Sequence, residues 1–244
     1  MDQTEIWLTR LFNDHLAGLG NSILALVGLP ATPRPWTNFI SMELLVVLLI
    51  VIVFAMLRAR LSVATPGKFQ QTFELVYEFI REQTDDLGGH DAHRYMAFFG
   101  MLFIFVLFAN LIGVIPGFQS PTMYYYVPAG CAIATFLYYN GAGIKAVGLG
   151  KHLAHLLGPV WWMAPLMFVI EIISHLARPL SLTLRLYANM YAGEAVTNVF
   201  LKLTYFLIPA VFMALHVFVA LLQAYIFMAL TIIYVGGAVT HEQH

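Results

Sequence analysis

Long apolar runs alternate with short polar breaks along this chain, and the first run lies near the N-terminus. Residues 39–57 form an apolar run with a single charged residue, Glu43. At 1.5 Å per residue, a helix of this length is about 30 Å long, which matches the hydrocarbon core of a bilayer. We predict a first membrane span at 38–57, preceded by a mixed N-terminal segment at 1–37.

The middle of the chain is the most apolar part. Residues 95–144 contain no Asp, Glu, Lys or Arg, and a stretch rich in proline and glycine interrupts them at 116–130. Prolines and glycines of this density are typical of a turn. The pattern predicts a helical hairpin at 95–143, with its two spans at about 96–115 and about 123–143.

An amphipathic segment at 67–84 separates the first span from this hairpin. Its apolar residues recur at helical spacing: Phe69, Phe73, Val76, Tyr77 and Ile80. The other face carries polar and charged residues: Lys68, Gln71, Glu78, Arg81 and Glu82. This pattern is typical of a helix that lies in the membrane interface. A helix packed on a protein partner is the alternative.

The C-terminal segment, 160–236, is apolar with few and isolated charged residues. A continuous helix over 161–203 would be about 65 Å long, twice the thickness of the bilayer core. Such a helix must break at Pro179, tilt steeply, or lie nearly in the membrane plane.

Composition confirms the class that the runs suggest. The chain has 60% hydrophobic and 10% charged residues, whereas soluble domains have about 45–50% and about 25%. We therefore predict an all-α integral membrane protein that forms one domain over 1–244. It should have about five membrane helices and one interfacial helix. A net charge of −1 provides no field to attract nucleic acid, and a single cysteine, Cys131, cannot form an internal disulfide.

Basic residues indicate the orientation. Arg58, Arg60 and Lys68 follow the first span directly. Cytoplasmic flanks of membrane helices carry an excess of Lys and Arg, so we expect the N-terminus on the periplasmic side. Lys145 and Lys151 likewise return the hairpin to the cytoplasm. No signal or transit peptide is recognisable, which favours the inner (plasma) membrane of a bacterium.

The C-terminal segment carries ionisable residues where they are costly, at about 2.5–3.5 kcal/mol for an arginine at a helix centre. At 100° per residue, five polar residues lie within one stripe of about 80° if the helix continues through Pro179. These are Glu171, His175, Arg178, Arg185 and Asn189. The first three can pair with one another as a structural network, in which Arg178 would form a structural ion pair; a place in the proton path is the alternative for Glu171 and His175.

Arg185 has no such local explanation. No carboxylate occupies its i±3 or i±4 positions, and its guanidinium stays charged at any physiological pH. Its partner is expected to be a carboxylate on another helix or another chain. An opposite charge within about 4–6 Å lowers the pKa of an acid by about 1–3 units. The pairing therefore favours proton release.

Three further polar residues could line an aqueous path. Glu194 lies off the stripe, and His216 and Gln223 share a face of the last helix because they are seven residues apart. A histidine simply hydrogen-bonded within a helix bundle is the alternative for His216.

Two C-terminal segments together resemble subunit a of the F-type ATP synthase: PLSLTLRLYANMYAGE at 179–194 and HVFVALLQAYIFMALTIIY at 216–234. The turn NLIGVIPGFQSPT at 110–122 resembles the mid-chain turn of that family. The resemblance extends from about residue 38 to the end.

This resemblance implies a proton-channel stator subunit. It would pack against a rotating ring of c subunits through two long, near-horizontal helices, and it would have the b-subunit peripheral stalk, the rest of the ATP synthase and membrane lipid as partners. Two aqueous half-channels would carry protons to and from a ring carboxylate. By itself the subunit would not be an enzyme, and it would bind no cofactor, metal, nucleotide or nucleic acid. The chain has no P-loop, in agreement.

Carried over residue by residue, the essential arginine of the family is Arg185. It would separate the half-channels and keep the passing carboxylate ionised. Asn189, Glu194, His216 and Gln223 match positions that line the path, and Glu171 lies where the family often has an acidic or polar channel residue. His175 has no place in the family pattern, although it shares the stripe.

The chain departs from the family at two places. After Thr122 many relatives carry an Asp and an Asn, whereas this chain has Met123 and a run of tyrosines, Tyr124–Tyr126. This chain therefore lacks one polar group that would be expected in the channel by which protons enter. Ala188 and Tyr187 stand where Gly and Phe are common.

Three other classes of protein compete with this interpretation. An intramembrane hydrolase would need a Ser–His or metal motif, and the histidine pairs His152/His155 and His241/His244 are too few ligands for one. A di-haem electron carrier would use His175 and His216 as axial ligands, which an absorbance spectrum would reveal. A transporter could use the same polar stripe, but it would work without a ring partner.

Overall fold

A computed structural model of the chain describes residues 5–26, 28–62, 65–115, 117–148, 164–203 and 207–239. These residues form helices and turns, and none of them belongs to a strand. The prediction of an all-α protein is confirmed. Some predicted features lie outside the described residues: Pro116, Lys151, His152, His155, His241 and His244.

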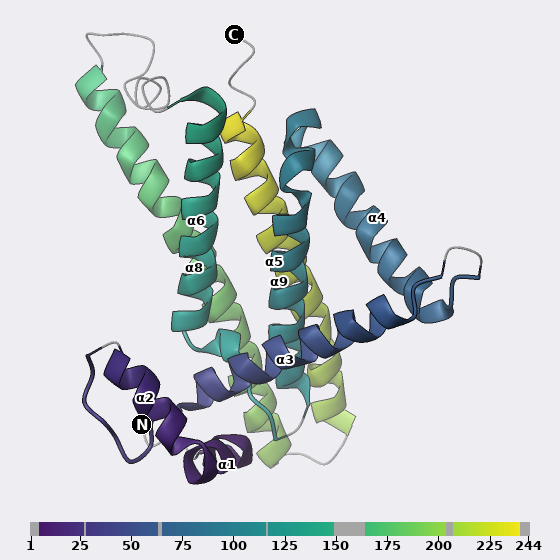
Figure 1. The fold of residues 1–244 in the computed structure, drawn as a ribbon, viewed down its shortest axis with the longest axis vertical. Coiled ribbons are helices and arrows are strands. Elements are labelled where there is room, and N and C mark those ends of the chain that lie inside the picture. The colour runs from purple at the N-terminus through teal and green to yellow at the C-terminus, as the bar shows by residue number, and fades with distance from the viewer. Residues whose placement is uncertain are drawn as a thin grey trace.

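The helices follow one another in a simple order (Figure 1). They are α1 (Trp7–His15), α2 (Ala17–Leu26), α3 (Asn38–Ala59), α4 (Lys68–Gly88), α5 (Met96–Leu111), α6 (Tyr126–Val147), α8 (Ala164–Leu203) and α9 (Leu207–Val239). Short 3-10 helices connect them: η1 (His90–Tyr95), η2 (Ile112–Val114) and η3 (Pro121–Met123).

Within the described residues, four helices are long and apolar enough to cross a membrane: Asn38–Ala59, Ala92–Val114, Leu166–Phe200 and Ala210–Val239. They correspond to the predicted first span, the first arm of the hairpin and the two C-terminal helices. The second arm of the hairpin is α6, which packs against α8 and α9. The chain is therefore an integral membrane protein built from helices.

The core lies where α5, α6, α8 and α9 meet, with α9 in contact with all three partners and with α4. Large side chains fill it, among them Phe99 of α5, Tyr139 of α6, Met190 of α8 and Met228 of α9, each no more than 2% exposed. Small residues such as Ala220 and Ala224 are also buried on α9. They let neighbouring helices approach closely, as is usual in membrane bundles.

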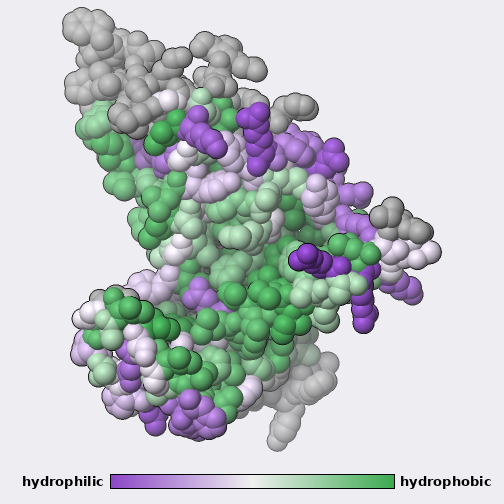
Figure 2. Space-filling view, viewed as in Figure 1, coloured by the Kyte–Doolittle hydropathy of each residue, from purple (hydrophilic) through white to green (hydrophobic). Residues whose placement is uncertain are grey.

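The outer surface is apolar as well. Leucines on the exposed sides of α3 and α8, such as Leu48 and Leu180, are 55% and 60% exposed. Figure 2 shows hydrophobic residues across the middle of one face, with hydrophilic residues gathered towards its edges. An apolar surface of this extent is stable in lipid or against other membrane helices, and not in water.

Helix α8 runs through Pro179 without interruption and comprises 40 residues. At 1.5 Å per residue it is about 60 Å long. A break at Pro179, one of the three predicted possibilities, is therefore excluded. The hydroxyl of Thr183 donates a hydrogen bond of 2.8 Å to the Pro179 carbonyl. A helix twice as long as the bilayer core is thick must tilt steeply or lie nearly in the membrane plane.

Helix α4 combines the two arrangements considered for it. Ile80, Thr84 and Gly88 are buried against the rest of the chain, and α4 packs on α5 and α9. Leu75 on its other side is 67% exposed, and Tyr77, which faces the space beside α3, is 56% exposed. The helix is thus attached to its own subunit and still offers apolar side chains to an interface.

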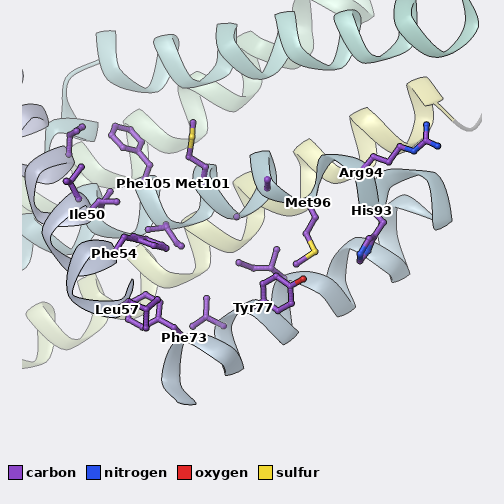
Figure 3. Close-up of a pocket in the computed structure, with 17 residues that line it drawn as sticks. Ile50, Phe54, Leu57, Phe73, Tyr77, His93, Arg94, Met96, Met101 and Phe105 are labelled. Atoms are coloured by element: carbon purple, nitrogen blue, oxygen red, sulfur yellow. The ribbon is translucent and has the colours of Figure 1, made fainter. Parts of the chain in front are cut away.

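A large apolar cavity of about 860 Å³ lies between α3, α4 and α5. Figure 3 shows Phe54 of α3, Phe73 of α4 and Phe105 of α5 along it, with His93 and Arg94 at one end. None of the polar residues predicted to line a path borders this cavity.

Helices α4 and α9 approach each other closely at Gly88 and Gly236. A larger side chain at Gly236 is therefore expected to destabilise the fold. A Cβ atom on Gly236 would lie 2.8 Å from the Cα of Gly88. Gly236→Val should therefore push the helices apart, and overpacking of this kind costs about 1–3 kcal/mol. We expect less subunit in the membrane and a lower thermal midpoint. Gly237→Val is the matched control, because no atom lies within 4 Å of a Cβ there. Equal stability of both variants would contradict the close approach.

Candidate functional site

Helix α8 presents polar groups on two sides. Arg185 and Asn189 are exposed, and Glu194 is buried, with a side chain that is 6% exposed. Because the helix is continuous, the helical spacing used to predict the stripe applies along its length. Glu194 lies about 140° away from Glu171 at 100° per residue, which accounts for its inward orientation.

Arg185 lies without a counter-charge among the described residues of its own subunit. Small residues on the same exposed side of α8, Ser181, Ala188 and Ala192, flank it. Such residues permit another helix to approach closely, so Arg185 is accessible to a group outside this chain.

The predicted network of Glu171, His175 and Arg178 forms only in part. Nδ1 of His175 lies 3.2 Å from Oε1 of Glu171. The guanidinium of Arg178 instead lies over two rings, 5.9 Å from the centroid of Tyr139 and 5.3 Å from that of Tyr234. We correct the ion pair predicted for Arg178 to a cation–π contact, in which aromatic faces of α6 and α9 stabilise the charge.

Glu194 faces the connection between α5 and α6. The backbone N–H of Ser120 donates a hydrogen bond to its carboxylate. Its Oε2 atom is buried and has no hydrogen-bond partner within the described chain. An unpaired buried oxygen is costly, so this atom marks a place where a proton or a water molecule is expected to bind.

A chain of hydrogen bonds links this connection to α5 and α9. The Thr122 hydroxyl donates to Oδ1 of Asn110 at 2.6 Å, and it lies 2.6 Å from the Ser120 hydroxyl. The Asn110 amide donates to the Ala220 carbonyl of α9 at 3.4 Å. Sequence analysis assigned no role to these residues. The mid-chain turn motif, which contains all three of the side chains, was the signal that could have indicated them.

His216 belongs to α9, and its side chain faces α8. It is 5% exposed, and its Nε2 atom has no partner in the described residues. Its ring lies against Gly193, where a Cβ would be 3.4 Å from Nδ1 of His216. A cavity of about 340 Å³ opens here, lined by His216, Asn189 and Thr197 among others. Gln223 is also buried, at 7% exposed, two turns further along α9.

The structure thus brings Asn189 and His216 to one cavity, and it places Glu194 against a separate polar cluster. Glu171 and His175 lie nearer the N-terminal end of α8 and pair with each other. No group of three or more His, Cys, Asp or Glu in the described chain could hold a metal ion.

Fold and site together define an all-helical membrane protein with an unpaired arginine exposed on a long tilted helix and two polar regions beside it. The sequence model of the ATP synthase A chain family matches residues 39–236. ATP synthase subunit a of Solibacter usitatus is 64% identical over 95% of this chain and all of the relative. The corresponding subunits of Koribacter versatilis and a Sulfurihydrogenibium species are 44% and 38% identical, over 97% and 84% of this chain and 98% of each relative. The chain belongs to the ATP synthase subunit a family.

Proposed function

We propose that this chain is the proton-channel stator subunit of an F-type ATP synthase, and that Arg185 is its central charge. One observation carries the proposal. A permanently charged guanidinium is exposed on an apolar helix, with small residues on either side and no counter-charge in the described chain. Its partner is therefore a carboxylate outside the chain, which a rotating ring of c subunits would supply.

The chemistry follows from this pairing. A cation within about 4–6 Å lowers the pKa of a carboxyl group by about 1–3 units. Each ring carboxylate that passes Arg185 would therefore release its proton, and the positive charge would keep a proton from crossing directly between the two sides. One charge that crosses 100 mV supplies only about 2.3 kcal/mol. ATP synthesis thus requires the sum of several protons, which rotation provides.

Two aqueous half-channels would serve the ring. The cavity that contains Asn189 and His216 is a candidate for one of them, and the polar cluster around Glu194 is a candidate for the other. Gln223 and the Glu171–His175 pair would extend these paths. The length of α8 supports a near-horizontal course, because only a helix far from the membrane normal can stay within the bilayer along about 60 Å.

The proposed function also implies an orientation in the membrane and contacts with other subunits. Arg58 in the last turn of α3 and Arg60 directly after it support a cytoplasmic position for that end of the helix, and the N-terminus would then lie in the periplasm of a bacterial cell. The b-subunit stalk would hold the chain still against the ring. Nucleotide chemistry would take place on other subunits, so this chain is not an enzyme by itself. ATP-driven proton pumping by Arg185 variants tests the proposal as a whole.

Glu194 and His216 give a separate prediction about pH. Glu194→Gln and His216→Gln should each reduce pumping in part and shift its pH optimum, because each removes a group that titrates in the path. Proton pumping in inverted vesicles between pH 6 and 9 measures this. Glu82→Gln on the exposed side of α4 is the matched control. Two pH profiles identical to that of the control would remove both residues from the path.

A further inference from the structure

The N-terminal helix pair, α1 and α2, comes before the first membrane span and contributes no residue to the proposed proton path. It also lies outside the residues that the family model matches, which begin at 39. Figure 1 shows the pair beside the N-terminal end of α3. The proposed function therefore gives this part of the chain no role.

Hydrogen bonds fix the helix pair to the segment that leads into α3. The backbone N–H of Trp36 donates a hydrogen bond of 3.0 Å to Oδ1 of Asn13, and the Asn13 amide donates one of 3.0 Å to the Trp36 carbonyl. The backbone N–H of Ile6 donates at 3.3 Å to Oδ1 of Asn38, the first residue of α3. The pair is therefore held in one position relative to the span.

The inner side of α2 packs closely on the same segment. A Cβ atom on Gly20 would lie 2.6 Å from Cγ of Pro35, and the indole N–H of Trp36 donates a hydrogen bond of 2.9 Å to the Leu16 carbonyl. Pro35 and Trp36 lie just before the apolar helix α3, which begins at Asn38. Tryptophans are enriched where a span meets the headgroups. Helix α2 therefore lies at the level of the membrane interface.

The outer side of α2 is apolar. Leu19, Ile23 and Leu26 are 60%, 54% and 87% exposed, and their spacing of four and three residues places them on one side of the helix. No residue of α2 carries a charge. Leu44 and Leu48 of the adjoining span are exposed as well. Apolar surface therefore extends from the span to the helix pair, and it is unfavourable in water.

We propose that the N-terminal helix pair is an anchor in the membrane interface, with the apolar side of α2 inserted among the lipids at the N-terminal end of α3. The depth of α2 favours lipid as the occupant. The side chains do so as well, because Leu19, Ile23 and Leu26 provide no aromatic, charged or hydrogen-bonding group. Binding energy in protein interfaces is concentrated on Trp, Tyr and Arg, whereas leucine is under-represented there.

The anchor also contacts the connection between α5 and α6. The ring of Trp7 in α1 meets the ring of Phe118 edge-on, with 5.8 Å between the centroids. A helix pair held among the lipid headgroups would therefore keep this connection and the N-terminal end of α3 at a constant depth. The inference concerns depth in the membrane, and it does not depend on the proton path or on which side the N-terminus lies.

Quenching by spin-labelled lipids tests the anchor, in vesicles that contain the complete ATP synthase. Cys131, the single cysteine of this chain, is replaced by Ala, and accessible cysteines of the other subunits are removed. An environment-sensitive fluorophore is then attached at Ile23→Cys or Leu26→Cys. An interfacial helix inserts its apolar side about 5–10 Å into the boundary between headgroups and acyl chains. A spin label near the headgroup end of the acyl chain should therefore quench more strongly than one near its methyl end.

Ala25→Cys is the matched control, because Ala25 is exposed and lies about 160° around the helix from Ile23. We expect quenching at Ile23 and Leu26 to be at least about twofold stronger than at this control. Equal quenching at all three positions would overturn the insertion of the apolar side. So would stronger quenching by the label near the methyl end, which would place α2 within the hydrocarbon core.

Two other results would replace lipid with a different occupant and so overturn the inference. Unquenched emission typical of water would show that the helix pair stands clear of the membrane. Unquenched emission typical of an apolar environment would show that another subunit covers Ile23 and Leu26. ATP-driven proton pumping by the same vesicles is measured beside the quenching, and the proposed function and the anchor can therefore fail separately.

Discussion

Inverted membrane vesicles that carry Arg185→Ala are expected to lose ATP-driven proton pumping by at least about 100-fold, the usual effect of removing a charge that stabilises the reacting group. Without the guanidinium, a ring carboxylate facing α8 would have no cation to hold it ionised. It would keep its proton in an apolar environment. Because Arg185 makes no ion pair within its own subunit among the described residues, its removal should leave the fold and the assembly of the complex intact.

The same variant also tests whether Arg185 separates the two half-channels. Passive proton leak through the vesicles, measured without ATP, should rise in Arg185→Ala if the charge blocks direct passage. Arg178→Gln is the matched control on the same helix, since Arg178 lies over Tyr139 and Tyr234 and should affect stability rather than coupling. Normal pumping by an assembled Arg185→Ala complex would show that Arg185 is structural, and the stator assignment of this residue would then be withdrawn.

Arg185→Lys is expected to fail nearly as completely, although it preserves a basic side chain. A buried lysine can lose its proton, whereas an arginine cannot, and an ammonium group cannot form the planar two-pronged contact of a guanidinium with a carboxylate. The rate of ATP synthesis driven by an imposed proton gradient, divided by the amount of assembled complex, measures the effect. The same Arg178→Lys exchange serves as the control for a change from arginine to lysine in α8. Synthesis at the normal rate by Arg185→Lys would mean that any positive charge suffices, and it would contradict the role given to the guanidinium.

Much of the fold follows from local properties of the sequence. The apolar run at 39–57 became α3, and the uncharged stretch at 95–144 became α5 and α6. Hydropathy predicts such elements because in lipid a backbone can satisfy its hydrogen bonds only within a helix or a closed barrel. The stripe that contains Arg185 and Asn189 is predictable for the same reason, since the helical period sets the direction of every side chain on α8.

The contacts of the polar side chains, in contrast, could not be predicted from the local sequence. The sequence offered an ion pair as one possibility for Arg178, whereas the structure places its guanidinium over the rings of Tyr139 and Tyr234. These rings lie about 40 and 56 residues away along the chain, on helices whose packing no local pattern describes. For Asn110 and Thr122, too, hydrogen bonding depends on how the turn folds back on α5.

The sequence by itself determined the class of the molecule, its spans, its family and the isolation of Arg185 from nearby carboxylates. These depend on composition, periodicity and motifs, all of which are properties of neighbouring positions. Only the tertiary structure decided that α8 runs unbroken through Pro179, that Glu194 meets Ser120, and that Tyr124 alone of its run turns inward. These outcomes depend on which helix surfaces fit together, and close packing between distant segments is a property of the folded chain as a whole.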